Sequence, residues 1–303
     1  MTKKGDKVIK RIISTAVAMA LVLIILSSVI LALFMTGYEI YQDVRYGSAE
    51  NCVMDIYVPK KAYQRKHNGC VLFIHGGGWT GGDKSEEDLR CRNVANNGYI
   101  AINVNYTLYN DENKDWYTVD LVLDEIDAAL GFSKVFCKDM GIELTMAATS
   151  GYSAGGHLSM LYSYSRRESA PLEIKFTASM AGPAEIGFNA WNKDTAVAIA
   201  RMLSGVTVTD EDIDSGRANE IFNSISPVYY VDERSPHSLF IYGGKDTLVT
   251  PKNAEALVNK FNTVGASYDY FYLPRATHAL ERNLNLRLAY SKRLIDCCDE
   301  YFN

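Results

Sequence analysis

From residue 38 onward, short apolar runs alternate with stretches whose apolar residues recur at helical spacing. Apolar runs that end at Gly or Pro predict buried strands, whereas the helical spacing predicts amphipathic helices. The predicted strands are residues 38–46, 52–58, 71–74, 99–104, 145–150, 174–180, 239–243 and 268–273. The predicted helices are residues 86–96, 119–135, 153–165, 194–203, 253–264 and 283–301. This order is typical of an α/β fold with a mostly parallel sheet and helices on both faces.

The beginning of the chain has a different pattern. Residues 1–11 carry five basic residues and one acidic residue, and an uncharged apolar run then covers residues 12–35. As a helix this run would be about 36 Å long, enough for the roughly 30 Å of bilayer hydrocarbon. A secretory signal peptide usually has a shorter apolar core and a small-residue cleavage site, which residues 31–35 do not offer.

We therefore predict a basic cytoplasmic tail (1–11) and a single uncleaved transmembrane anchor (12–35) in the cell membrane, with the rest of the chain outside. Secretion after cleavage of the segment is the alternative. Residues 36–48 are a linker with the first strand, and residues 49–303 have the length of one domain. Within this domain, the stretch 182–236 is longer than a simple crossover between two strands. Its length predicts a small insertion or cap.

Charge and cysteine content exclude several classes of function. The net charge is −5 although the first residues are basic, so the body is acidic and unsuited to nucleic acid. None of the six cysteines forms a C-x-x-C pair or a Cys/His spacing typical of a metal site, and ordinary packing is expected for all six. The stretch 243–246, Gly-Gly-Lys-Asp, lacks the spacing of a phosphate-binding loop.

Two glycine-rich motifs carry the chemistry. The stretch 151–155, Gly-Tyr-Ser-Ala-Gly, follows a predicted strand and opens a predicted helix, which is the context of a nucleophile elbow exposing Ser153. The stretch 75–79, His-Gly-Gly-Gly-Trp, is an oxyanion-loop motif. Backbone N–H groups of Gly77, Gly78 and Ala154 are the expected donors to an oxyanion. Trp79 and Tyr152 flank the site and are candidates to line a substrate pocket, with simple core packing as the equal alternative.

A serine hydroxyl needs an adjacent base to act as a nucleophile. The chain has five histidines: His67, His75, His157, His237 and His278. His157 lies one helical turn beyond the elbow, and His237 enters a strand at the opposite end of the sheet. His75 belongs to the oxyanion loop, and His67 to a polar connection. His278 alone follows a predicted strand and precedes a helix, at the carboxyl edge of the sheet, and is the predicted base.

The predicted orienting acid is Asp246, which comes just after the strand 239–243 and lies between serine and histidine in the chain. Asp269 is a weaker candidate for the orienting acid because it lies within a strand. Asp210, Asp212 and Asp214 are weaker candidates because they lie in the polar insertion. The sequence thus predicts an ordered triad of Ser153, Asp246 and His278.

With these motifs, residues 38–303 resemble the alpha/beta-hydrolase superfamily, in the esterase branch with hormone-sensitive-lipase-like and bacterial feruloyl or acetyl esterase-like enzymes. The matching stretches are 75–79, 82–84 (Gly-Asp-Lys), 104–106 (Val-Asn-Tyr), 151–158 (Gly-Tyr-Ser-Ala-Gly-Gly-His-Leu), Asp246 and 277–278 (Thr-His). The resemblance implies ester hydrolysis through an acyl-enzyme intermediate, without metal or organic cofactor. Thr107 departs from the pattern, where arginine is common, and this puts in doubt a contact behind the oxyanion loop.

The expected function is that of a serine carboxylesterase acting on small-molecule or glycan esters with short acyl groups. The short insertion, in place of a larger N-terminal cap, favours small or polar esters over long-chain lipids. Amide or peptide hydrolysis by the same triad is one alternative. A catalytically silent hydrolase fold that serves as a surface interaction module is another.

Overall fold

The computed structural model describes residue 15, residues 17–24 and residues 37–303, and the chain divides into two units, Met1–Gly37 and Tyr38–Asn303. The predicted tail 1–11 lies outside the described residues, as does most of the predicted anchor 12–35. Among the residues that are described, no helix combines the length and apolarity needed to cross a membrane. Everything below concerns the second unit.

The described strands form one eight-stranded sheet in the order β1-β2-β4-β3-β5-β6-β7-β8. Their bounds are β1 (Tyr38–Arg45), β2 (Val53–Pro59), β3 (Asn68–Ile74), β4 (Ile100–Val104), β5 (Leu144–Tyr152), β6 (Glu173–Met180), β7 (His237–Gly243) and β8 (Tyr268–Leu273). β1 and β2 pair antiparallel, as do β2 and β4, and the remaining pairs are parallel. The predicted mostly parallel sheet is confirmed.

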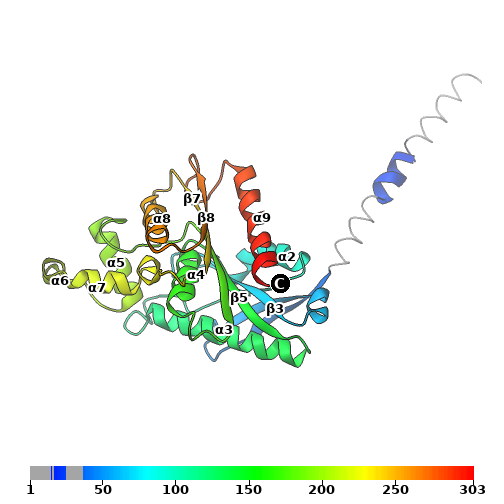
Figure 1. The fold of residues 1–303 in the computed structure, drawn as a ribbon, viewed down its shortest axis with the longest axis horizontal. Helices are drawn as coiled ribbons and strands as arrows, with labels where there is room; N and C mark the ends of the chain where they lie inside the picture. Colours follow the sequence, from blue (N-terminus) through cyan, green and yellow to red (C-terminus); the bar gives the residue numbers. More distant parts are fainter. Residues whose placement is uncertain (1–14, 16, 25–36) are drawn as a thin grey trace, which may run out of the picture. The chain divides into compact units, whose positions relative to one another are not determined.

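Helices cover both faces of this sheet (Figure 1). They are α2 (Asp88–Asn96), α3 (Val119–Asp139), α4 (Ala154–Ser165), α5 (Lys193–Ser204), α6 (Asp210–Ser215), α7 (Arg217–Ser224), α8 (Lys252–Val264) and α9 (Leu284–Tyr301), with short 3-10 helices η1 (Lys60–Gln64), η2 (Lys84–Glu87) and η3 (Pro227–Tyr230). Alternation along β3 assigns the faces: Leu72 and Ile74 join the core under α3 and α4, whereas Val71 and Phe73 join the core under α2 and α9.

Several predicted boundaries were wrong, for physical reasons. β3 begins three residues earlier than predicted, at Asn68, because Gly69 lets the ring of Phe302 pack directly on the strand. A Cβ at Gly69 would lie 2.2 Å from that ring. α3 continues to Asp139 because Cys137 is fully buried and extends its apolar face. The helix predicted over 86–96 is a 3-10 turn followed by α2.

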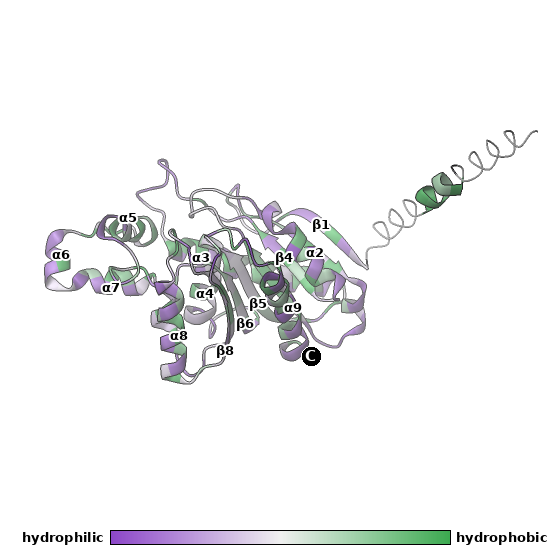
Figure 2. Cartoon of the chain, turned by 90° about the horizontal axis from the view of Figure 1, so that it is seen from above, coloured by the Kyte–Doolittle hydropathy of each residue, from purple (hydrophilic) through white to green (hydrophobic). Residues whose placement is uncertain are grey.

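The predicted insertion, residues 182–236, contains α5, α6, α7 and η3. α5 to α7 extend away from the sheet in both views, and α6 is coloured mainly as hydrophilic (Figure 2). The two short helices α6 and α7 were not predicted. α6 is held at its start by a capping box, in which Thr209 and Asp212 bond reciprocally, and Gly216 in the left-handed region separates the two helices. All six cysteines are buried and unpaired, as ordinary packing predicts.

We expect Gly155→Ala to destabilise the domain by more than about 3 kcal/mol. A Cβ there would lie 1.9 Å from the carbonyl oxygen of Ile74, and neither backbone can move without disturbing β3. The matched control is Gly131→Ala on α3, where a Cβ would lie 3.7 Å from Pro171 in ordinary contact. That change should be neutral or stabilising by up to about 1 kcal/mol. Urea unfolding followed by circular dichroism measures both, and equal stabilities would contradict the prediction.

Candidate active site

Ser153 occupies a tight strained turn between β5 and α4. Its backbone dihedrals are φ 54° and ψ −119°, values that a non-glycine residue adopts only where the surroundings enforce them. The turn is fixed by the Ser153 N–H, which donates to the carbonyl of Met180 at 2.8 Å. It also needs glycine at Gly151, where a Cβ would lie 2.3 Å from the backbone of Gly155. The side chain is thereby presented at the carboxyl edge of the sheet.

The structure brings the three predicted residues of the triad into one line of hydrogen bonds. His278 Nε2 lies 2.9 Å from Ser153 Oγ, and His278 Nδ1 lies 2.7 Å from Asp246 Oδ2. A carboxylate accepts only, so Nδ1 carries the ring proton and Nε2 is left to accept from the serine hydroxyl. His278 comes from the loop after β8, and Asp246 from the loop after β7.

Asp246 is held so that only one of its oxygens faces the histidine. Its Oδ1 accepts the backbone N–H groups of Leu248 and Val249, both at 2.9 Å, and its side chain has no exposed surface. The imidazole is fixed from the other side as well, because the Tyr152 hydroxyl donates to the His278 carbonyl at 2.7 Å. Tyr152 is therefore a support of the histidine loop as well as a pocket residue.

The glycine loop after β3 offers free backbone donors. Gly77, Gly78 and Trp79 all have positive φ, which turns successive peptide groups in one direction. Gly77 requires glycine, since a Cβ would lie 2.1 Å from the Gly81 carbonyl oxygen. Within the described part of the chain, the N–H groups of Gly77 and Gly78 have no hydrogen-bond partner. Ala154 is the first residue of α4, where a helix amide has no intrahelical acceptor.

A pocket of about 370 Å³ opens at this point. Its lining consists of Gly77, Gly78, Trp79, Tyr152, Ser153, Pro183, Trp191, Ile199, Leu248, Val249 and His278. Trp79 and Tyr152 were predicted as candidates for this wall. Pro183, Trp191 and Ile199 come from the insertion 182–236, for which a wall was expected but no residue was named. Leu248 and Val249 were missed, although two apolar residues just after a strand-end acid are a usable signal.

His157 has a structural role that sequence reasoning missed. It is fully buried on α4, and its Nδ1 accepts from the Trp79 indole N–H at 3.3 Å. Its Nε2 donates to the carbonyl of Ile225 at 2.8 Å, so the ring joins the oxyanion loop to the segment after α7. The histidine thereby holds one wall of the pocket. The Trp79 side chain makes this bond and is only 5% exposed, so it packs in the core and also lines the pocket.

The burial of His157 predicts a loss of stability in acid. Desolvation lowers the pKa of His157 from 6.5 to about 4, because the charged ring is disfavoured where water cannot reach it. The contribution of the neutral ring is complete above pH 6.5 and is lost as the pH falls toward 4, amounting to about 3 kcal/mol. We expect His157→Gln, which cannot titrate, to lose less stability over this interval than the wild type. Urea unfolding at both pH values tests this, and equal losses would contradict it.

Behind the oxyanion loop, two of the stretches quoted for the resemblance meet in one network. The Asn105 side chain accepts from the Lys84 backbone N–H at 2.6 Å and donates to Asp83 at 3.0 Å. The Lys84 ammonium is ion-paired with buried Asp55 at 2.6 Å. Tyr106 donates its hydroxyl to the His75 carbonyl at 3.1 Å and stacks on the His75 ring. These contacts fix the loop from behind, and no role for them was predicted.

Thr107, the predicted departure from the family pattern, has contacts of its own. Its backbone N–H and its hydroxyl both donate to the carboxylate of Glu125 on α3, at 2.8 and 2.6 Å. Glu125 is buried, with 8% exposure, and also receives the thiol of Cys52. Thr107 thereby joins the segment after β4 to α3.

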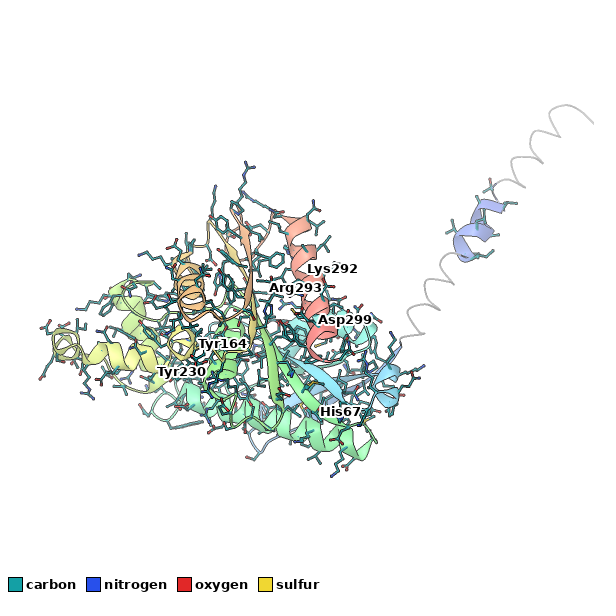
Figure 3. All side chains as sticks on the ribbon, in the orientation of Figure 1. His67, Tyr164, Tyr230, Lys292, Arg293 and Asp299 are labelled. Carbon is teal, nitrogen blue, oxygen red and sulfur yellow. The ribbon has the colours of Figure 1, made fainter. Side chains whose placement is uncertain are left out.

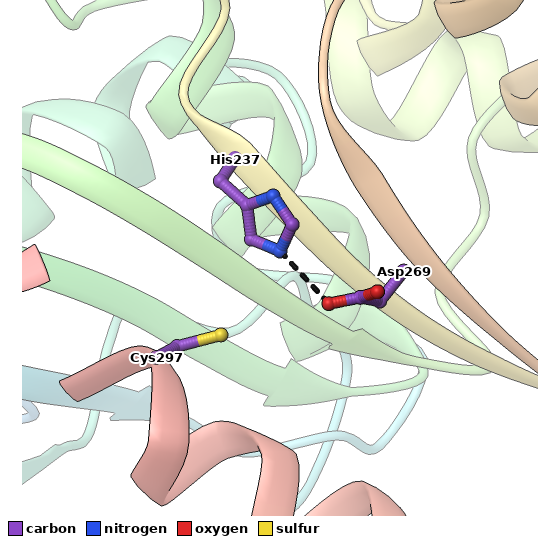
Figure 4. Close-up of side chains that lie close together, drawn as sticks. All are labelled: His237, Asp269 and Cys297. Carbon is purple, nitrogen blue, oxygen red and sulfur yellow. Dashed lines mark hydrogen bonds and ion pairs between the residues drawn. The ribbon is translucent and has the colours of Figure 1, made fainter. Parts of the chain in front are cut away.

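A second histidine–aspartate pair lies at the amino end of β7, away from the active edge (Figure 4). His237 Nε2 lies 3.1 Å from Asp269 Oδ2, and Cys297 brings its sulfur within 4.8 Å of both groups. Among the described residues, this is the group whose spacing could suit a metal. Arg293 on α9 (Figure 3) donates to the same Asp269 oxygen at 2.5 Å, and its fixed positive charge opposes a cation there. The cluster instead binds α9 to the sheet.

Comparison with solved structures shows the same fold. A truncated carbohydrate esterase from gut microbiota is 19% identical, with a TM-score of 0.70 over 88% of this chain and 98% of that chain. Esterase B from Lactobacillus rhamnosis, inhibited by a tributyrin phosphonate, is 19% identical, with a TM-score of 0.67 over 88% of this chain and 86% of that chain.

A curated relative is also found by sequence. Esterase LipC of Mycobacterium tuberculosis is 23% identical over 246 residues, covering 78% of this chain. The aligned region spans 59% of the length of LipC. The likeness is therefore to part of that protein.

The model of the BD-FAE family matches residues 54–261. That span runs from β2 into α8 and includes the glycine loop, the elbow at Ser153 and Asp246. His278 lies beyond it and is placed by its hydrogen bonds alone. Since the match covers more than half of the sequence, the chain belongs to the BD-FAE family.

Proposed function

We propose that the protein is a serine carboxylesterase that hydrolyses short-chain or carbohydrate-linked acyl esters through an acyl-enzyme intermediate. The observation that carries this proposal is the hydrogen-bonded line from Ser153 through His278 to Asp246. The names of the relatives support the class of substrate, because LipC and Esterase B are called esterases and the gut protein is called a carbohydrate esterase.

In the first half of the reaction Ser153 Oγ attacks the ester carbonyl carbon and gives its proton to His278 Nε2. The carbonyl oxygen becomes an oxyanion, which accepts hydrogen bonds from the N–H groups of Gly77, Gly78 and Ala154. Asp246 stabilises the imidazolium that forms. The C–O bond to the alcohol then breaks, the alcohol oxygen takes the proton from Nε2, and the acyl group is left on Ser153.

In the second half a water molecule takes the place of the alcohol. It gives a proton to His278 Nε2 as its oxygen attacks the acyl carbon, and the oxyanion forms again in the same place. Collapse breaks the bond to Ser153 Oγ, which recovers the proton from the histidine. The products are the carboxylic acid and the regenerated hydroxyl.

The lining of the reactive pocket favours uncharged acyl groups of modest size. Its walls are the rings of Trp79 and Trp191 with the side chains of Ile199, Leu248 and Val249, and no Asp, Glu, Lys or Arg of the described residues lines it. A volume of about 370 Å³ is near the low end of ligand pockets, which usually measure about 300–1,000 Å³. Short aliphatic or single-ring acyl groups fit this description.

The test is hydrolysis of p-nitrophenyl esters of increasing acyl length by the purified full chain, together with labelling by a fluorophosphonate probe. We expect labelling at Ser153 and a kcat/KM that is highest for short acyl groups and falls as the chain outgrows the pocket. Matched p-nitroanilides measure amide hydrolysis in parallel. Faster anilide than ester turnover would replace the esterase with an amidase, and a folded chain without turnover or labelling would favour the silent interaction module.

Attachment to a membrane through residues 12–35 is a second part of the proposal. Its support is the uncharged apolar run that follows the basic residues 1–11. The full chain should sediment with membranes and resist extraction by carbonate, with the domain accessible to protease from outside. Release of the full chain by carbonate would overturn the anchor, and a shortened soluble product would favour signal cleavage.

A further inference from the structure

A second pocket, of about 330 Å³, lies on the other helical layer, between α2 and α9. Its lining consists of Phe73, Glu86, Leu89, Arg90, Asn93, Val94, Ser150, Met180, Leu284, Arg287, Leu288, Tyr290, Ser291 and Leu294. None of these residues lines the reactive pocket. The strands β3, β5 and β6 contribute Phe73, Ser150 and Met180, so the pocket reaches the sheet itself.

One polar group in this pocket lacks the partner that burial normally requires. Tyr290 is 3% exposed, and its hydroxyl has no hydrogen-bond partner among the described residues. Burial raises the pKa of Tyr290 well above 10, so the hydroxyl keeps its proton and can donate. An unsatisfied buried hydroxyl lowers stability, and a bound acceptor would remove that cost.

Two arginines add positive charge at the same place. Arg90 Nη1 lies 2.8 Å from Glu87 Oε2, but neither atom has a hydrogen-bond partner among the described residues, and burial raises the pKa of Glu87. Arg287 is exposed and has no ion-pair partner among the described residues. The acidic side chain in the lining is Glu86, on η2.

Beside these polar groups the pocket is apolar and open. Leu89, Leu284 and Leu288 line it and remain 80%, 66% and 58% exposed. Leucines left this exposed around one hollow mark a place where an apolar group can bind. The pocket therefore combines an apolar wall with a hydroxyl donor and two guanidinium groups.

We propose that this pocket binds an amphiphilic monocarboxylate, with the carboxylate accepting from Tyr290 and the arginines and the apolar tail lying on the leucines. Guanidinium groups pair with carboxylates through charge-assisted hydrogen bonds, which gives the site its preference for an acid. Such acids are the product class of the proposed esterase. The binding site does not depend on that reaction, because it shares no residue with the reactive pocket.

The test uses the full chain with the substitution Ser153→Ala, and hexanoate is the probe. It measures binding without turnover, so its result does not depend on whether the proposed esterase activity is found. Calorimetric titration gives the affinity, and 1-hexanol serves as the uncharged control. We expect Tyr290→Phe to weaken hexanoate binding about five- to tenfold, the value of one hydrogen bond, without changing the binding of hexanol. The matched control is Tyr301→Phe, which removes a hydroxyl from the same helix outside the pocket and should leave the affinity unchanged.

Thermal unfolding without ligand supplies the second readout. Since the Tyr290 hydroxyl has no partner, Tyr290→Phe should keep or raise the melting temperature. A lowered melting temperature would show that the hydroxyl is structural and would overturn the proposal. Absence of hexanoate binding, or binding that Tyr290→Phe leaves unchanged, would overturn it as well, since the acid would then bind elsewhere or nowhere.

Discussion

Replacement of Ser153 by alanine is expected to lower kcat for ester hydrolysis by about a millionfold while the domain stays folded. The hydroxyl is the atom that attacks, and His278 Nε2 has its hydrogen bond to Ser153 Oγ, whereas the Tyr152 hydroxyl bonds only to the backbone carbonyl of His278. The fold should persist because the backbone of the turn is held by the Ser153 N–H and the carbonyl of Met180, not by the side chain. Progress curves with a short-chain p-nitrophenyl ester and circular dichroism measure the two effects.

A serine on the same helix provides the control. Ser165 closes α4 and donates its hydroxyl to the carbonyl of Leu161, so Ser165→Ala removes a hydroxyl of the same kind far from the reaction. It should keep full activity and full labelling by a fluorophosphonate. If Ser153→Ala retained activity within tenfold of the wild type, the triad would not be the catalytic unit.

The parts of this site that lie at strand ends could be predicted from sequence. Ser153, Asp246 and His278 each follow an apolar strand of a parallel sheet, and the carboxyl ends of such strands meet at one edge. The three residues could therefore be predicted to lie close together although they are far apart in the sequence. The glycine loop follows a fourth strand at the same edge.

The parts that depend on helix packing could not be predicted. Trp191 and Ile199 lie near or on α5, and which side of that segment faces the serine is decided by how the insertion packs. The bond between His157 and Trp79 joins a helix interior to a loop, and no local pattern marks it. The second pocket needs residues such as Leu89 on α2 and Leu288 on α9, which are almost two hundred residues apart in the chain. Such contacts follow from tertiary packing alone.

Asp246→Asn is expected to lower kcat about ten-thousandfold, the loss seen when the orienting carboxylate of such a triad becomes an amide. The backbone N–H groups of Leu248 and Val249 both need an acceptor, so the amide must keep its oxygen toward them. Its NH₂ then faces His278 Nδ1, which has to accept a hydrogen bond in place of donating one. The ring proton moves to Nε2, and the histidine can no longer take the proton of Ser153.

The second aspartate–histidine pair makes a matched control for this argument. Asp269→Asn changes the same functional group beside His237, at the amino end of β7 and away from the reacting serine. It should leave kcat unchanged and lower only stability, because Arg293 loses one of its two carboxylate partners and keeps Glu300. Steady-state rates and urea unfolding of both variants separate the two effects. If Asp246→Asn lowers activity no more than Asp269→Asn does, the roles of the two aspartates are wrongly assigned. If Asp246→Asn alone lowers activity and the variant stays folded, Asp246 is the acid that fixes the tautomer of His278.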